Sequence, residues 1–523
     1  MAKKWWVLLV VCAGTFMLLL DVTIVVVALP DIQTGLHTTF ADVQWVVDAY
    51  ALTLASLLLT AGILADRYGR RLLFVIGLVI FTGGSLLCGL AQSPLMLILS
   101  RALQGVGGAI LFATSLALLA QTFHGRERGV AFGVWGAITG ISTALGPILG
   151  GIITTGISWR GIFLVNIPVG IAAIAISLWQ LDESKRPQAS RPDWAGFVTL
   201  TAGLVGLVYG LIRAGEMSWS DPGVAASLTL GVVFLVAFVV VELRVKHPMF
   251  DLSLFKIPTF LGGSIAAFAM NGSLFAMLVY LVLYLQDDLG YSALGAGVRI
   301  AIISGAMFVS ATISGRLSSH VPVRWLIGPG LFLVGIALIT MAGLDGATSW
   351  THLVPGFIIG GIGSGLVNPP LASTAVGVVT PERSGMASGV NTTFRQIGIA
   401  VAIATYGSIF TAALGRGLTS ALAGQPALAS KAPELVTALK QGTIGPVVAS
   451  TPPNLRGPLV AGLHTAFAGA LNDLFYVSAA LALVGALCST LLIRSQDFVA
   501  THAPTPEPDR TSEDLASAGT SRS

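Results

Sequence analysis

The stretch GILADRYGRRLLFV, residues 62–75, separates two long apolar segments by a short charged one. Gly62 has no side chain and permits close approach of a neighbouring helix. Asp66 can accept hydrogen bonds at the N-terminus of a neighbouring helix, where the helix dipole favours an anion, and it can pair with Arg70. Gly69 permits a tight turn. The pattern predicts two membrane-spanning helices joined by a structured turn; the alternative is a basic loop that contains an aspartate by chance.

The composition excludes a soluble globular domain. Of the 523 residues, 54% are hydrophobic and 10% are charged, and the mean hydropathy is +0.85. A spanning helix needs about 20 apolar residues. Lipid offers the backbone no hydrogen-bond partners, so only helices or closed barrels can span it, and these apolar runs are too long for barrel strands. We predict an all-α polytopic membrane protein with 14 transmembrane helices, at residues 6–29, 43–64, 72–91, 95–119, 130–154, 161–180, 194–213, 223–242, 259–286, 294–315, 325–343, 352–378, 386–413 and 474–493.

The distribution of lysine and arginine predicts the orientation. Loops on the same side as the N-terminus carry fourteen of these residues, whereas the short loops on the other side carry Arg160 and Arg213. Basic loop residues concentrate on the cytoplasmic side. We therefore expect a multi-pass protein of the cell inner (plasma) membrane, with both termini in the cytoplasm. The start, MAKKWWVLLV, is expected to open the first span, because its apolar run is too long for a cleaved signal peptide.

Four stretches resemble the motifs of one transporter family. Residues 62–71 read G-x-L-x-D-R-x-G-R-R and resemble the signature loop of the major facilitator superfamily, which implies a gate at Gly62, Asp66, Arg67, Gly69 and Arg70. LDVTIVVVALP, residues 20–30, resembles the first-span motif of its fourteen-helix drug:proton antiporter family (multidrug efflux type), although Val26 stands where an asparagine is usual. LILSRALQGVGGAI, residues 97–110, resembles the fourth-span motif at Arg101, Gln104 and Gly105. Residues 133–151 resemble the fifth-span antiporter motif at Gly133, Gly146, Pro147, Gly150 and Gly151.

The resemblance implies a major facilitator fold of two six-helix halves. GVGGAI at 105–110, in the fourth span, recurs as GIGSGL at 361–366 in the twelfth. An offset of eight spans instead of six implies two extra helices between the halves. The expected domains are an N-terminal half, a two-helix linker, a C-terminal half with a long external loop, and a disordered cytoplasmic tail, at residues 1–180, 181–258, 259–494 (loop 414–463) and 495–523.

Three charged residues inside spans are the candidates for proton coupling: Asp21, Asp48 and Arg101. A charge at the centre of a bilayer costs about 2.5–3.5 kcal/mol on insertion scales, so such residues usually have a function. Arginine stays protonated, and by analogy with the family either Asp21 or a polar group on the first span is the expected partner of Arg101. A change in their distance would alter the proton affinity of Asp21. For Asp48 the alternative is a water-exposed carboxylate near a helix start; for Asp21 and Arg101 it is packing or helix pairing.

The remaining candidates concern movement and cargo. The fifth-span glycines and Pro147 predict a kinked helix that packs closely and can rock, or an ordinary packing seam. We expect the substrate cavity near the middle of the bilayer between the halves, with carboxylates and much apolar wall. Its possible contacts are Asn271, Tyr280, Tyr284, Arg395 and Gln396. For Arg395, substrate, partner and gating roles are all open. Arg299 is expected to reach water at the outer surface.

These features favour a proton-coupled antiporter that exports amphipathic, drug-like or cationic small molecules by alternating access. The alternative is an exporter of the same fold for one metabolite, amino acid, siderophore or lipid. A membrane enzyme is disfavoured, because the sequence has no metal-ligand cluster, and no P-loop for ATP is present. The expected partners are a small-molecule substrate, protons and the lipid bilayer, with no nucleic acid, no cofactor and no metal. We expect a monomer.

Overall fold

The computed structural model describes residues 3–123, 125–183, 192–217, 219–246, 248–318, 320–379, 384–424, 428, 431–440 and 444–498. Helices account for nearly all of this part of the chain, and no β-strand occurs in it. The N-terminal half contains α1 (Lys3–Leu36), α2 (Phe40–Tyr68), α3 (Arg70–Gly89), α4 (Pro94–Thr122), α5 (Gly125–Gly156), α6 (Gly161–Leu164) and α7 (Asn166–Gln180). The two extra helices are α8 (Trp194–Glu216) and α9 (Pro222–Arg244).

The C-terminal half contains one interrupted spanning segment. It begins after η1 (Leu252–Lys256) and consists of α10 (Pro258–Met270), the π-helical η2 (Asn271–Phe275), α11 (Ala276–Leu283) and the π-helical η3 (Tyr284–Asp288). The remaining elements are α12 (Ala293–Leu317), α13 (Arg324–Met341), η4 (Trp350–Leu353), α14 (Val354–Gly377), α15 (Ser384–Leu422), α17 (Ala432–Lys440), α18 (Ile444–Ser450), α19 (Pro453–Leu492) and η6 (Ser495–Asp497).

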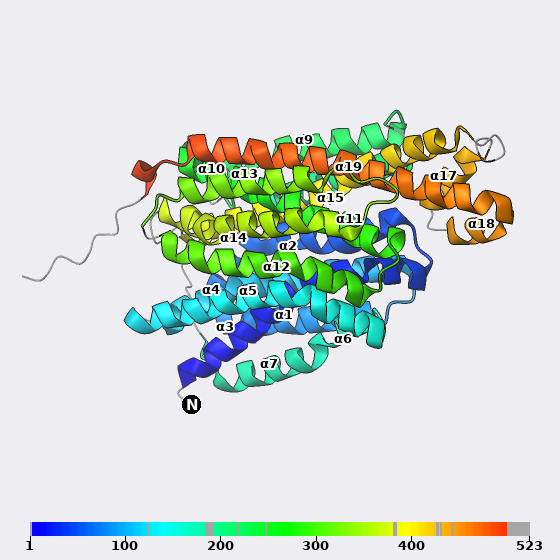
Figure 1. Cartoon of the computed structure of the whole chain (residues 1–523). Helices are drawn as coiled ribbons and strands as arrows, with labels where there is room; N and C mark the ends of the chain where they lie inside the picture. Colours follow the sequence, from blue (N-terminus) through cyan, green and yellow to red (C-terminus); the bar gives the residue numbers. More distant parts are fainter. Residues whose placement is uncertain are drawn as a thin grey trace, which may run out of the picture.

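The long helices form one bundle, and the first and last described residues lie at the same end of it (Figure 1). We name this the terminal end, and the opposite end, which carries α17 and α18, the distal end. Thirteen helical segments of the described chain are long and apolar enough to cross a membrane. The predicted span 130–154 lies in α5, which is helical over 32 residues. The predicted all-α polytopic fold is confirmed.

The predicted external loop 414–463 is helical at both ends. The helix α15 continues to Leu422, and α19 begins at Pro453, so each exceeds the length needed to cross a bilayer. Alanine and leucine are strong helix formers, and hydropathy alone does not register a helix that extends beyond the apolar core. The last span, predicted to begin at residue 474, is therefore part of a longer helix, and Asp473 lies within α19. In the predicted disordered tail, residues 495–523, Asp497 accepts a hydrogen bond of 2.6 Å from Thr259. The described part of this tail ends at residue 498.

The internal repeat is visible in the helix packing. In α4, a Cβ on Gly105 would meet the backbone of Tyr50 in α2, and one on Gly107 would meet the backbone of Phe81 in α3. In α14, a Cβ on Gly361 would meet the backbone of α12, and one on Gly363 that of α13. The fourth and twelfth spans thus use their glycines against equivalent neighbours, as the eight-span offset predicts.

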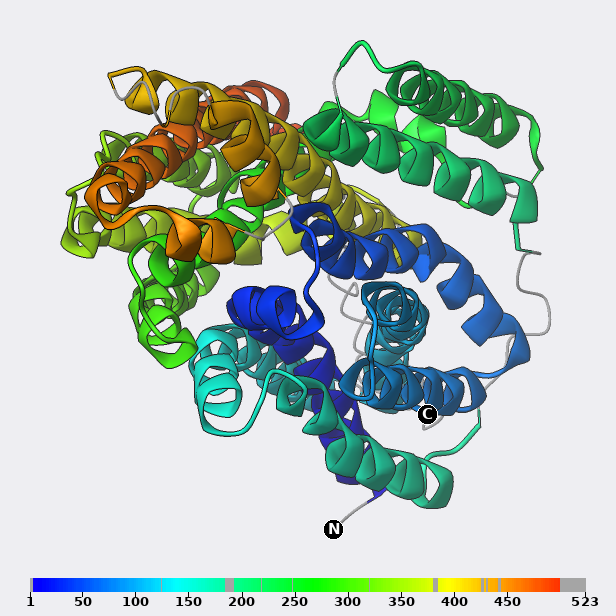
Figure 2. The same ribbon diagram turned by 90° about the vertical axis from the view of Figure 1, so that its right-hand side faces the viewer.

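Two pairs of helices connect the halves. The helix α5 packs on α12, and α2 packs on α15. Near the distal end, Leu294 N donates to Thr155 Oγ1 at 3.2 Å, and Gln286 Nε2 donates to the carbonyl of Val27 at 2.7 Å. The extra helices α8 and α9 pair with each other at the edge of the bundle, where α8 packs on α15 and α2 (Figure 2). These distal contacts join the two halves near this end.

The α5–α12 contact depends on Gly151. A Cβ there would lie 2.5 Å from the Cα of Leu294 and 2.8 Å from the carbonyl oxygen of Ala293. We expect Gly151→Leu to force the helices apart, destabilise this conformation by about 1–3 kcal/mol, and decrease cross-linking between cysteines introduced at Thr155 and Leu294 in a background without native cysteines. Gly156→Leu is the matched control, since a Cβ at Gly156 meets nothing within 4 Å. Equal cross-linking in both variants would contradict a close seam.

Candidate functional site

Arg101 is the centre of a polar network buried inside the N-terminal half. Its Nη1 contacts Asp21 Oδ2 at 2.5 Å and Gln104 Oε1 at 2.6 Å, and its Nε donates to the carbonyl of Val46 at 3.1 Å. Arg101 is 1% exposed and Asp21 is 0% exposed. The predicted pairing of Asp21 with Arg101 is confirmed, and it connects α1, α2 and α4.

The network extends into α3 and α7. Gln104 Nε2 donates to Asp21 Oδ1 at 2.9 Å, so both oxygens of the carboxylate are bonded. The same amide contacts Ser85 Oγ at 3.3 Å, and Asn166 Nδ2 donates to that hydroxyl at 3.0 Å. The Arg101 guanidinium also lies over the ring of Tyr50, 4.3 Å from its centre. A buried ion pair needs such additional hydrogen bonds, because its attraction alone does not offset desolvation.

Two carboxylates, those of Asp66 and Glu183, accept hydrogen bonds from the signature loop between α2 and α3. Arg70 binds Asp66 Oδ1 through Nε at 2.9 Å and Nη2 at 2.7 Å, as predicted. The free backbone N–H groups at the start of α3 are satisfied by Glu183, which accepts from Leu72 N at 3.0 Å. The prediction that Asp66 serves a helix N-terminus therefore differs from the structure: a residue more than one hundred positions away does so. Gly69 has φ 130°, a backbone conformation that favours glycine.

The other motif glycines lie at different distances from their neighbours. Gly146 and Gly150 pack against Thr23 and Ile24 of α1, whereas Gly151 packs against α12. Gly133 lies in α5, but its surroundings are outside the described part. A Cβ on Gly62 would be 4.0 Å from Ala113, an ordinary contact, so this conformation does not use close approach there. Arg67 lies 5.9 Å from the ring centre of Tyr68.

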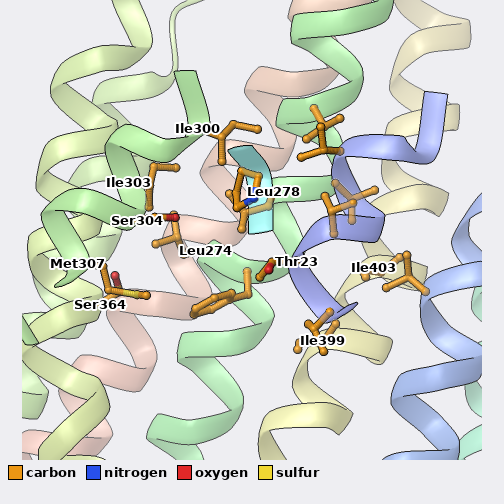
Figure 3. A pocket seen from close by; sticks show the side chains of 18 residues that line it. Thr23, Leu274, Leu278, Ile300, Ile303, Ser304, Met307, Ser364, Ile399 and Ile403 are labelled. Atoms are coloured by element: carbon orange, nitrogen blue, oxygen red, sulfur yellow. The ribbon is translucent and has the colours of Figure 1, made fainter. Parts of the chain in front are cut away.

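A cavity lies between the halves (Figure 3). Its volume is about 50 Å³, smaller than the roughly 300–1,000 Å³ typical of sites for drug-sized ligands. Its wall is apolar apart from Thr23, Ser304 and Ser364. The lining residues are Val22, Thr23, Val26, Val27, Val47, Pro147, Leu274, Phe275, Leu278, Val279, Val282, Ile300, Ile303, Ser304, Met307, Ser364, Ile399 and Ile403.

Comparison with known proteins identifies the family. The sequence profile of the Major Facilitator Superfamily matches residues 11–403. The chain belongs to the Major Facilitator Superfamily. It is 31% identical over 488 residues to the tetracenomycin C resistance and export protein of Streptomyces glaucescens, covering 92% of this chain and 90% of that protein. It is 34% identical over 406 residues to the multidrug resistance protein Stp of Mycobacterium tuberculosis (strain CDC 1551 / Oshkosh), covering 77% and 75% respectively.

The fold has counterparts among solved structures. A bacterial homologue of the human lysosomal transporter Spinster, in an inward-facing and occupied conformation, superimposes with a TM-score of 0.59 at 18% identity, over 97% of this chain and 100% of that one. The Major Facilitator Superfamily consists of transporters, so this chain is a multi-pass membrane transporter and not an enzyme.

The cavity of this transporter differs from the prediction in its wall. We expected carboxylates there, but the lining residues include no acidic side chain. Asp21 instead faces Arg101 within the N-terminal half. Val26, which replaces the usual asparagine of the family motif, is one of the lining residues, and the substitution makes the wall more apolar. Sequence periodicity could not distinguish the faces of helices that are apolar all round.

The five predicted cavity contacts do not line it. Tyr280 donates from its hydroxyl to the carbonyl of Ile403 at 2.7 Å and accepts from Gln44 Nε2 at 3.2 Å, behind the wall. Asn271 donates to Ala267 O at 2.9 Å, and Tyr284 OH lies 3.5 Å from Thr348 O.

Arg395 and Gln396 follow one another on α15, and both are partly buried. Roles for these five residues in substrate binding stay predictions. Gln44 had no sequence signal beyond its polarity.

Asp48 is buried behind the wall, beside the lining residue Val47. It lies in the third turn of α2 and is 0% exposed, which excludes a water-exposed carboxylate in this conformation. Neither of its side-chain oxygens has a hydrogen-bond partner in the described chain. Tyr280 is within electrostatic range of it. The transporter thus contains one fully bonded buried aspartate, Asp21, and one that lacks partners, Asp48.

Arg299 is partly exposed near the distal end, and its contact with water stays a prediction. Its guanidinium lies over the rings of Tyr291, at 3.6 Å, and Trp350, at 4.6 Å. Its Nη1 donates to the carbonyl of Gly295 at 2.8 Å. Aromatic faces attract a guanidinium, so two rings near the distal end hold this arginine in place.

The buried charges of Asp21 and Arg101 should destabilise the transporter when only one of the two is removed. We expect Arg101→Gln to lower the free energy of unfolding in detergent by about 3–5 kcal/mol, because it leaves a buried carboxylate without its cation. The double variant Asp21→Asn/Arg101→Gln should be more stable than Arg101→Gln alone, since no unpaired charge remains. Thermal unfolding of the wild type, both single variants and the double variant measures this coupling. Simple addition of the two single losses would show that the residues act independently.

Proposed function

We propose that this transporter is a proton-coupled antiporter that exports amphipathic, drug-like compounds by alternating access. The observation that carries the proposal is the cavity between the halves, whose lining is almost wholly apolar, as in sites for drug-like molecules. Two relatives are named as an antibiotic resistance and export protein and as a multidrug resistance protein, which supports the same direction and class of cargo. A wall without acidic residues suits amphipathic compounds better than the cations that the sequence also suggested.

The coupling proposal rests on the contrast between two aspartates. Asp21 has charged and amide donors on both oxygens, an environment for the ionised form. Asp48 has none, and an ionised carboxylate there would be an unpaired charge in an apolar interior. We infer that Asp48 holds a proton while hydrogen bonds join the halves near the distal end. A rearrangement that hydrates Asp48, or moves Arg101 away from Asp21, changes the affinity for protons, so that protons and cargo favour different conformations.

The same proposal includes the placement in the cell. The first and last described residues lie at one end of the bundle (Figure 1), and the excess of lysine and arginine in the loops of that end supports a cytoplasmic location for it. The distal end, where hydrogen bonds join the halves, then faces outward, and we infer that this conformation takes up cargo from the inside. We expect a monomer in the inner (plasma) membrane, because the cavity is formed by the two halves of a single chain.

Reconstitution in liposomes with an imposed pH gradient tests the function. We expect efflux of ethidium or of a neutral antibiotic to follow the gradient in the wild type, and to lose this dependence in Asp21→Asn and Asp48→Asn. Asp473→Asn is the control, since Asp473 is an exposed carboxylate outside the cavity, 3.9 Å from Arg416. Efflux by the wild type that ignores the gradient would reject proton coupling, and unchanged coupling in both aspartate variants would reject their role.

A second candidate is export of one dedicated metabolite. The relative named for tetracenomycin C favours it, because that name refers to a single compound. A panel of unrelated compounds in the same liposome assay separates the two: broad efflux supports a multidrug exporter, and efflux of one chemical class supports a dedicated one.

A further inference from the structure

Arg395 is a cation without an anionic partner. Its Nη1 binds Asn368 Oδ1 at 2.8 Å, and its Nε binds Asn391 Oδ1 at 3.3 Å. Both acceptors are neutral amides, and no carboxylate of the described chain forms an ion pair with this residue. Arg101, in comparison, is paired with Asp21, and Arg299 lies between two aromatic rings. A charge inside a membrane protein that lacks a protein partner commonly marks the path of a substrate or ion.

The position of Arg395 relates it to the cavity. On α15, the lining residues Ile399 and Ile403 follow it by four and eight positions, and residues at this spacing share one face of a helix. On α14, the lining residue Ser364 precedes Asn368 by four positions. The bond between Arg395 and Asn368 therefore connects the two helices one turn from the cavity, towards the terminal end. Ser364 and Ile399 lie on one side of the cavity, and Ile300 lies on the other (Figure 3).

The apolar cavity wall and the charged Arg395 together suit a ligand that has a hydrophobic body and an acidic group. The apolar wall accommodates a hydrophobic body and offers hydroxyl groups only at Thr23, Ser304 and Ser364. The guanidinium of Arg395, on the terminal side of the cavity, matches a carboxylate or another acidic oxygen, which a guanidinium can bind through two parallel hydrogen bonds. Two asparagine oxygens orient the guanidinium without neutralising its charge, so its electrostatic attraction for an anion is retained.

We propose that Arg395 binds the acidic group of exported compounds, and that this site takes hydrophobic aromatic acids in preference to their neutral analogues. This inference rests on the proposed function and specifies its class of cargo. The halves separate to admit the hydrophobic body against the apolar wall, and the acid contacts the guanidinium on the terminal side of the cavity. A compound that enters from the terminal end meets Arg395 before it reaches the cavity wall.

A pair of probes that differ in one group tests the inference. Pyrenebutyrate and 1-pyrenebutanol share an aromatic body, but only the first is ionised at pH 7. Binding to the purified full-length protein in detergent can be followed by energy transfer from tryptophan to pyrene. We expect the wild type to bind pyrenebutyrate about tenfold more tightly, since a hydrogen bond to a charged group is stronger than a neutral one. Arg395→Gln should abolish this preference and leave pyrenebutanol binding unchanged.

Two further variants separate recognition from a structural role. Asn368→Asp nearly preserves shape but gives Arg395 an internal carboxylate, so it should also abolish the preference for the acid. Arg299→Gln removes an arginine near the distal end and should retain the preference. An equal loss of both probes in Arg395→Gln, or a wild type that does not discriminate between them, would overturn the inference. A retained preference for the acid together with the absence of gradient-driven efflux would reject the proposed function alone.

Discussion

The buried ion pair between Arg101 and Asp21 is the interaction around which the N-terminal half is organised. Arginine stays protonated in the interior, so the surrounding helices must supply its partners. Asp21 of α1, the Val46 carbonyl of α2 and Gln104 of α4 contact it directly, and the amide of Gln104 continues the network to Ser85 of α3. Because these polar groups satisfy each other within one half, the half can move as a unit without exposing an unpaired charge.

The cavity wall is apolar because the charges of Asp21 and Arg101 neutralise each other inside the N-terminal half. With Asp21 directed into its own half and Asp48 behind the wall, the surface between the halves is left to valine, leucine, isoleucine and a few hydroxyl groups. The halves meet through glycine contacts and a small number of hydrogen bonds, such as that from Gln286 to Val27. Contacts of this kind can separate at a modest cost in free energy, which suits alternating access. Arg395 forms no ion pair within the described residues, so on the proposed route of cargo its charge stays available to a ligand.

Much of the architecture was predictable because lipid restricts the backbone to a few solutions. The recurrence of GVGGAI as GIGSGL identified equivalent helices, and the structure places both against equivalent neighbours. Asp66 and Arg70 pair within one turn, a contact set by local spacing. The pairing of Arg101 with Asp21 was accessible only by analogy, since these residues are 80 positions apart. The role of Glu183 at the start of α3 had no local signal at all.

The sequence by itself determined that the chain is an all-helical membrane protein, and it located most of the glycines at close helix contacts, because each follows from hydropathy or from local spacing. Only the tertiary structure decided which face of each helix borders the cavity, that Asp21 is bonded on both oxygens whereas Asp48 has no partner, and that Arg395 is held by asparagines. The physical reason is that a helix apolar on all sides carries no periodic signal of its orientation. Its rotation is set by packing against neighbours that are distant in sequence.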